Sequence, residues 1–184
     1  MNAQLLPTGS AYFLAADSEI PVRRSLAVIV DNEPGVLARV IGLFSARGYN
    51  IDSLTVSETE HEKHISRITI VTTGKPQVIE QIKSQLDRMV PVHRVIDLSL
   101  NGDAVETELA LVKVAGTGDK RVEAMRLAAA FGAKTVDATL TSFIFELTGR
   151  VDEIERFIRL MTSVGLVEVA RTGIAAMSRG EKGL

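Results

Sequence analysis

The sequence predicts an α+β protein with two βαββαβ units in tandem, and three observations support this fold class. β-branched or alternating apolar runs, which favour strands, alternate with stretches whose apolar residues recur at helical spacing. The order strand, helix, strand, strand, helix, strand occurs twice, over residues 23–100 and again over residues 109–178. Gly48 and Gly132 stand at the end of the first helix in each unit. This order is the split βαβ, or ferredoxin-like, arrangement.

The first unit opens with a strand and a helix. The β-branched run "SLAVIVD" (residues 25–31) suits a buried strand. The helix follows in "PGVLARVIGLFSA", where Pro34 fits the first turn because its missing N–H needs no partner there. Gly48 suits the left-handed conformation that ends a helix. The apolar residues of this helix share one face: Val36, Leu37, Val40, Ile41 and Phe44.

Two strands, a second helix and a last strand complete the first unit. "NIDSLTVSET" and "HISRITIVTT" alternate in hydrophobicity on either side of the polar tip "EHEK", which predicts a hairpin. "PQVIEQIKSQLDRM" has the spacing of an amphipathic helix, and "VPVHRVIDLSL" provides the closing strand.

The second unit repeats this order with a shorter hairpin. "TELALVKVAG" predicts a strand, "DKRVEAMRLAAAFG" a helix, "AKTVDATLTSFIFELTG" a hairpin, "RVDEIERFIRLMTSVG" a helix and "LVEVARTGIAAM" a strand. The polar, acidic residues 101–108 are expected to link the two units, and residues 179–184 to form a tail. Residues 1–22 contain no Lys or Arg but include Asp17 and Glu19. This composition argues against a secretory or transit signal and favours a flexible or loosely docked arm.

The sheet of the first unit is expected to have an apolar face that its own helices leave uncovered. That face would carry Ala27, Ile29, Leu54, Val56, Ile68 and Ile70, or their alternates. Too many of these side chains are apolar for both faces of the sheet to contact water. We therefore expect a homodimer, which could pair symmetrically edge to edge, or a partner chain.

Composition excludes several classes of function. The chain has 21 Lys and Arg against 23 Asp and Glu, a net charge of −2, which gives neither a basic footprint for nucleic acid nor a polybasic membrane patch. Aromatic residues make up 4% with no Trp, so stacking platforms for single strands are not expected. No run approaches the length of a membrane span. The absence of cysteine fits a reducing cytoplasm, where we expect the protein to act.

The sequence offers no arrangement typical of catalysis. His61 and His64, with Glu60 and Glu62, could hold a metal ion, but a solvated hairpin tip explains them better. "AGTGDK" (residues 115–120) lacks the spacing of a phosphate-binding loop. We therefore predict no catalytic residue and no metal site in this chain.

The residues around the first helix favour binding of a free amino acid. A helix N-terminus presents unpaired N–H groups and partial positive charge, which suit a carboxylate, and Gly35 would allow a ligand to approach closely. Asn32 and Asn50 could each accept a hydrogen bond from an ammonium group. The alternative is purely structural: Asn32 would cap the helix and Asn50 would turn the chain after Gly48.

From Arg23 to Gly180 the sequence resembles the small, regulatory subunit of acetolactate (acetohydroxyacid) synthase. The resemblance is carried by "RVIGLFSARGYNIDSLTV", "SRITI", "QIKSQLDRMVPVHRVIDL", "LALVKV", "LVEVARTG" and "MSRG". "DNEPGVL" (residues 31–37) alone is similar to the wider class of ACT domains, which are ferredoxin-like modules that sense amino acids. The resemblance thus identifies the first unit as an ACT domain.

The resemblance also implies a site and partners. Valine would bind between two ACT domains of a homodimer, against Asn32, Gly35, Val36 and Leu37 of one chain and Asn50 and Ile51 of the other. The chain itself would be non-catalytic. It would activate a large catalytic subunit that carries thiamine diphosphate, Mg²⁺ and FAD, and valine would withdraw that activation. Two other hypotheses stay open: an ACT-type sensor that regulates a different enzyme or transcription, and a small enzyme or metalloprotein that uses His61 and His64.

Overall fold

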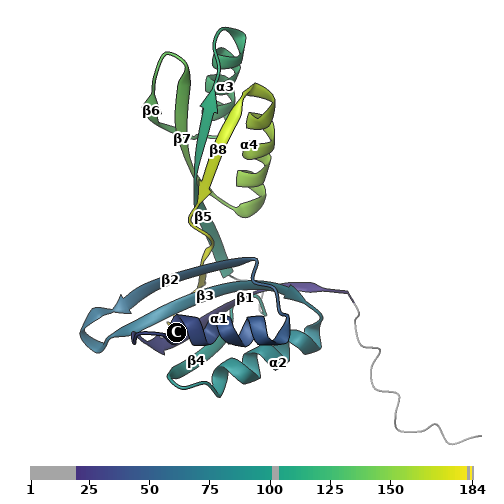
Figure 1. Ribbon diagram of the computed structural model, residues 1–184, viewed down its shortest axis with the longest axis vertical. Coiled ribbons are helices and arrows are strands. Elements are labelled where there is room, and N and C mark those ends of the chain that lie inside the picture. Colours follow the sequence, from purple (N-terminus) through teal and green to yellow (C-terminus); the bar gives the residue numbers. More distant parts are fainter. Residues whose placement is uncertain (1–19, 101–103, 182, 184) are drawn as a thin grey trace, which may run out of the picture.

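The computed structural model describes residues 20–100, 104–181 and 183, and it contains the first of the two expected units as a four-stranded antiparallel sheet. The strands lie in the order β2-β3-β1-β4, and α1 and α2 cover one face of the sheet (Figure 1). The elements are β1 (Val22–Asp31), α1 (Val36–Arg47), β2 (Ser53–Glu60), a short 3₁₀ turn (His61–Lys63), β3 (Ile65–Gly74), α2 (Pro76–Asp87) and β4 (Val92–Asp97).

The second unit has the same topology, with strands in the order β6-β7-β5-β8 and α3 and α4 on one face. A short last strand, β9, pairs with the first residues of β5. The elements are β5 (Ala104–Ala115), α3 (Asp119–Ala130), β6 (Lys134–Ala138), β7 (Ser142–Gly149), α4 (Val151–Val164), β8 (Leu166–Arg171) and β9 (Ala175–Ser178). The fold class predicted from the sequence, two βαββαβ units in tandem, is confirmed.

Two segments differ from the expected boundaries. Of the expected linker, residues 101–103 lie outside the described residues, and residues 104–108 belong to β5. β9 supplies the ladder hydrogen bonds that hold this polar stretch extended, since Ala104–Thr107 pair with Ala175–Ser178. The strand expected over residues 166–177 is interrupted between β8 and β9, where Gly173 has a φ of +82°. Of the expected arm, residues 1–19 lie outside the described part, and β1 begins at Val22.

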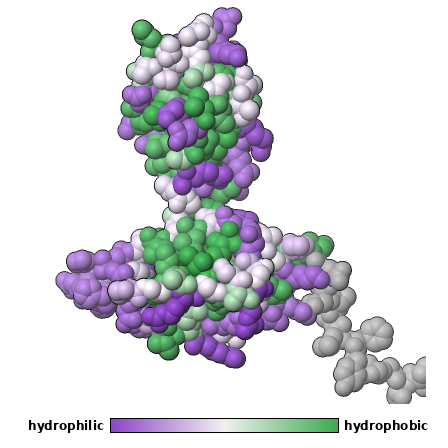
Figure 2. Space-filling view, in the orientation of Figure 1, coloured by the Kyte–Doolittle hydropathy of each residue, from purple (hydrophilic) through white to green (hydrophobic). Residues whose placement is uncertain are grey.

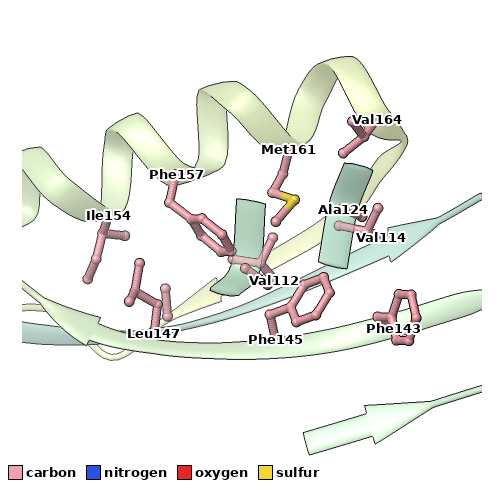
Figure 3. Close-up of a cluster of buried hydrophobic side chains, with 12 residues drawn as sticks. Val112, Val114, Ala124, Phe143, Phe145, Leu147, Ile154, Phe157, Met161 and Val164 are labelled. Carbon is pink, nitrogen blue, oxygen red and sulfur yellow. The ribbon is translucent and has the colours of Figure 1, made fainter. Parts of the chain in front are cut away.

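The core of the second unit lies between α4 and its sheet (Figure 3). One face of α4 carries four buried apolar side chains at helical spacing: Ile154, Phe157, Met161 and Val164. They pack on alternate residues of β5 and β7, among them Val112 and Phe145. The Phe145 and Phe157 rings meet edge to face with centroids 6.4 Å apart. These contacts place α4 firmly on the sheet.

The two faces of the first sheet divide its apolar residues differently from the expectation. Leu54, Ile68 and Ile70, expected on the uncovered face, pack with α1 and α2 instead. Ala27 does point away from the helices and is fully buried there, together with Val71. Because side chains alternate along a strand, the register decides which set meets the helices, and the sequence carried apolar residues in both sets.

The chain itself covers part of the face opposite α1 and α2. Ile174 and Ala176, from the segment 173–178, are 5% and 6% exposed and pack with Ala27 and Val71. We call residues 173–178 the cover segment. Figure 1 shows the second domain standing on this side of the first sheet. A partner chain, which was expected on this face, is therefore not what buries Ala27.

Side chains of the first sheet hold the backbone of the cover segment. The Ile174 N–H donates to Ser53 Oγ at 2.9 Å, and Thr55 Oγ1 donates to the Ile174 carbonyl at 3.0 Å. Arg67 on β3 donates to the Ala176 carbonyl. Ile174 lies between β8 and β9, outside both ladders, so Ser53 and Thr55 satisfy its backbone groups. Together with the bond from Arg67, these contacts join the two domains through β2 and β3.

The sheet of the second domain retains an apolar strip on its open face. Leu111, Ile144 and Ala170 line a shallow hollow beside the ion pair between Lys113 and Glu168, whose charged atoms are 2.6 Å apart. Leu111 is 37% exposed. The space-filling view shows hydrophobic residues gathered in a patch on each lobe, with hydrophilic residues around them (Figure 2).

Candidate functional site

The loop between β1 and α1 has a backbone conformation that exposes the helix N-terminus. Gly35 is the residue before α1 and adopts a left-handed conformation with a φ of +86°. No side chain caps the helix, so the structural role considered for Asn32, as the helix cap, is wrong. Pro34 precedes the cap and does not lie in the first turn as expected. The first N–H groups of α1 lack intrahelical partners, as in any helix, and they lie beside this loop.

The space above Gly35 is open. A side-chain carbon placed on Gly35 would have no atom within 4 Å. Behind it, Val36 is buried and Leu37 is half-buried, and both pack on the core between the helices and the sheet. The Val36 N–H donates to the Glu33 carbonyl at 3.3 Å. The next N–H groups of the first turn, those of Leu37 and Ala38, therefore remain for a carboxylate ligand above an apolar support.

Asn50 and Ile51 lie at the other end of α1, in the loop that leads to β2. Gly48 ends α1 in the left-handed conformation, as expected, with a φ of +66°. The Asn50 carbonyl accepts a hydrogen bond from Thr72 Oγ1 at 2.7 Å, and the Asn50 side-chain amino group donates to Asp52 Oδ1. Ile51 is half-buried against the same core as Leu37. The side-chain oxygen of exposed Asn50 is left as the group that can accept from a ligand.

The two halves of the expected site are far apart within one chain. Twelve residues of α1 separate them, and at about 1.5 Å per residue the helix is roughly 18 Å long. Asn32 and Asn50 can touch one small ligand only if they come from different chains.

The hairpin between β2 and β3 contacts the loop at Asn32, which the sequence did not indicate. The Asn32 N–H donates to the His64 carbonyl at 2.6 Å, and His64 has a left-handed φ of +52°. His61 Nδ1 lies 3.0 Å from the Glu58 carboxylate. Hydrogen bonds from His61 and, more weakly, from the Asn32 side chain hold the pKa of Glu58 below its usual value. His61 and Glu58 are three residues apart, but Asn32 is far from His64 and Glu58 in the sequence, so no local pattern could have revealed its contacts.

The histidines of the hairpin are exposed, as a solvated tip would be. The His61 and His64 side chains are 89% and 77% exposed. Within the described residues, no three His, Cys, Asp or Glu side chains are grouped so that they could hold a metal ion.

Comparison with known proteins decides the family. The family model described as the AHAS small subunit-like ACT domain matches residues 26–94, and the model described as the small subunit of acetolactate synthase matches residues 107–180. A probable acetolactate synthase small subunit from Archaeoglobus fulgidus is 45% identical over 161 residues, which are 88% of this chain and 99% of that relative. The chain belongs to the acetolactate synthase small-subunit family.

Further members of the acetolactate synthase small-subunit family agree over the same span. The isozyme 3 small subunit of Salmonella typhimurium is 44% identical over 162 residues, 88% of this chain and 98% of that protein. The crystal structure of the small subunit from Thermotoga maritima superposes with a TM-score of 0.79 at 38% identity, covering 88% of this chain and 99% of that one. The resemblance seen in the sequence is confirmed, and so is the ACT domain. In this family member, no helix of the described part is long and apolar enough to cross a membrane.

Between the two domains of this small subunit lies an open groove with two hollows, of about 600 and 470 Å³. Arg23, Val151 and Glu155 line both hollows. Arg23 pairs with Glu106 at 2.9 Å across the larger one. Both members of this ion pair line the larger hollow.

Proposed function

We propose that this chain is the regulatory subunit of an acetolactate synthase in branched-chain amino acid biosynthesis. It would raise the activity of a separate large catalytic chain, and L-valine bound between two ACT domains would withdraw that help. Membership of the acetolactate synthase small-subunit family over nearly the whole chain supports the partner. The catalytic chain would hold thiamine diphosphate, Mg²⁺ and FAD. The chain has no cysteine, which suits a cytoplasmic complex.

The observation that carries the valine site is its division between the two ends of α1. Asn32 and Gly35 offer a carboxylate site at the N-terminus, whereas Asn50 offers an acceptor at the C-terminus. A two-fold axis beside α1 would bring the N-terminus of one helix to the C-terminus of its copy, because isologous contacts run antiparallel. Two identical sites would then form, each built from both chains.

The surface of α1 and the neighbouring sheet edge suit such pairing. β2 is an edge strand in the sheet order, so its outer backbone groups are free to meet a second copy. The exposed side of α1 is built largely of small residues, and Ile41 on the same side is 38% exposed. Small residues allow two helices to approach closely. The exposed small residues are Ala38, Gly42, Ser45 and Ala46.

Regulation requires that valine bind two arrangements of the subunit with different affinity. The cover segment gives a physical connection, because Ser53 and Thr55 on β2 hold Ile174. Asn50 and Ile51 lead directly into β2. A shift of β2 on ligand binding would therefore move the contact with the second domain.

A matched pair of variants at Gly35 tests the site. Gly35→Asp places a carboxylate where the ligand carboxylate would bind, and Gly35→Asn places a neutral group of the same shape there. Both should cost about 1 kcal/mol of stability for the left-handed conformation, which Asn and Asp tolerate better than most residues. We expect Gly35→Asp to weaken L-valine binding at least tenfold more than Gly35→Asn does, because only Asp adds like-charge repulsion.

Calorimetric titration of the purified chain with L-valine, D-valine and L-glutamate gives the readout. Inhibition of the reconstituted holoenzyme by valine gives the second. Activation of the catalytic subunit should survive in both Gly35 variants. Equal valine affinity of the wild type and Gly35→Asp would show that this loop is not the site. A wild-type chain without selective L-valine binding would overturn the effector itself.

A further inference from the structure

We propose that Glu58 and Asp52 are positioning residues that orient the two site asparagines toward the ammonium group of an amino-acid ligand. The inference rests on the proposed function and deepens it. Neither Glu58 nor Asp52 is among the residues proposed to contact the ligand, which are Asn32, Gly35, Val36, Leu37, Asn50 and Ile51. Each carboxylate is proposed to act on one of the asparagines, and neither is expected to contact the ligand itself.

At Asn50 the arrangement is direct. The side-chain Nδ2 donates to Asp52 Oδ1 at 2.5 Å, and Thr73 Oγ1 donates to the other oxygen of Asp52 at 2.6 Å. The Asp52 N–H also donates to the Val71 carbonyl at 2.8 Å. Asp52 is thus held by β3 on both its backbone and its side chain, and it holds the amino group of Asn50 in turn.

At Asn32, a hydrogen bond to the hairpin holds the backbone. Its N–H donates to the carbonyl of His64, which follows the 3₁₀ turn at the hairpin tip. His64 is the one non-glycine residue with a positive φ in the part of the chain that the structure describes. Such a conformation is sparsely populated and points to a constraint imposed by the surroundings. Here it turns the His64 carbonyl toward Asn32.

Glu58 lies on β2, which β3 separates from β1, the strand that leads to Asn32. In the register, Val30 on β1 and Glu58 on β2 both lie opposite Ser66 on β3, so a small buried residue separates them. The Glu58 carboxylate accepts from His61 at 3.0 Å and lies 3.9 Å from His64 Nδ1. Its side chain keeps 29% of its accessible surface. The hydrogen bonds that lower the pKa of Glu58, among them the one from Asn32, keep it ionised near neutral pH.

An ionised carboxylate decides which way a carboxamide points. Because a carboxylate only accepts hydrogen bonds, it must face the NH₂ group of an asparagine. The carboxamide oxygen is then directed away from the carboxylate and is available to an N–H donor. Asn50 donates directly to Asp52, and the Asn32 side chain is among the groups that lower the pKa of Glu58, although the two asparagines lie at opposite ends of α1. Each half of the composite site therefore presents an oriented acceptor, the group that an ammonium ion requires.

The test uses isosteric variants and two ligands. Glu58→Gln and Asp52→Asn keep the shape of each side chain but can donate as well as accept, so the carboxamide is no longer held in one orientation. The ligands are L-valine and L-2-hydroxyisovalerate, which has the same carboxylate and side chain but no ammonium. Calorimetry with the full-length chain measures both affinities. Glu62→Gln, on the exposed 3₁₀ turn, is the matched control.

We expect each variant to weaken valine binding about tenfold, the effect of about 1.4 kcal/mol in binding free energy, and to leave the hydroxy acid within about twofold. Adding Asn32→Ala to Glu58→Gln should cause little further loss, because both changes remove the same interaction. If both variants keep the wild-type ratio of valine affinity to hydroxy-acid affinity, the positioning roles are overturned. A wild type that does not bind valine would instead overturn the proposed function, and this inference with it.

Discussion

Truncation of Ile174 tests whether the two domains are joined as the structure shows. Ile174 is 5% exposed and packs on the side of the first sheet opposite α1 and α2. Ile174→Ala removes about three methylene equivalents, which corresponds to roughly 2.4 kcal/mol of transfer free energy at ~0.8 kcal/mol each. The cavity left behind adds to this cost, and comparable core truncations cost about 2–5 kcal/mol. We expect about 3 kcal/mol, since a domain boundary can partly collapse.

Urea unfolding followed by circular dichroism measures the effect of Ile174→Ala. Val167→Ala is the control, because Val167 is 59% exposed on β8 and its truncation should cost less than about 0.5 kcal/mol. If the contact couples the domains, the wild type should unfold in one transition and the Ile174 variant should separate into two. Equal and small costs for the two variants would refute the reasoning, because Ile174 would then not be buried in solution.

The remaining predictions concern three glycines. Gly42→Arg should leave the monomer folded, because nothing lies within 4 Å of an added side-chain carbon. It should weaken the proposed dimer and valine binding together, as sedimentation and calorimetry would show; an unchanged dimer would exclude α1 from the interface. Gly165→Ala should cost about 3 kcal/mol, because the left-handed strain of ~1 kcal/mol is joined by a collision with the Ala115 carbonyl. Gly132→Ala, with the same kind of φ but open space, should cost only ~1 kcal/mol; similar melting shifts for the two would contradict this contrast.

Local patterns predicted the helices and most of the strands of both domains. Apolar spacing at Ile154, Phe157 and Met161 predicted the amphipathic α4, and Gly48 marked the end of α1. Such signals succeed because helix faces and helix ends depend on residues a few positions apart. Residues 104–107 were predicted to belong to a linker, because their strand structure depends on β9, which is distant in the sequence.

The sequence predicted only part of the candidate site, for the same reason. The chemistry of Gly35 and Asn50 predicted a carboxylate site and an acceptor, and this assignment stays a prediction. The sequence already placed Asn32 and Gly35 before α1 and Asn50 after it, and the resemblance assigned them to different chains; the length of α1 agrees with that division. Glu58 carried no local signal, because its contact with Asn32 spans three strands.

The sequence alone determined the fold class, the order of elements, the ACT loop and the family, since each depends on local spacing or on strings of residues shared with relatives. The tertiary structure alone decided three further points: which apolar set of the first sheet meets the helices, that Ile174 covers the other face, and that Asp52 holds the amino group of Asn50. These depend on strand register and on contacts between residues far apart in the chain, which backbone hydrogen bonding and burial settle together.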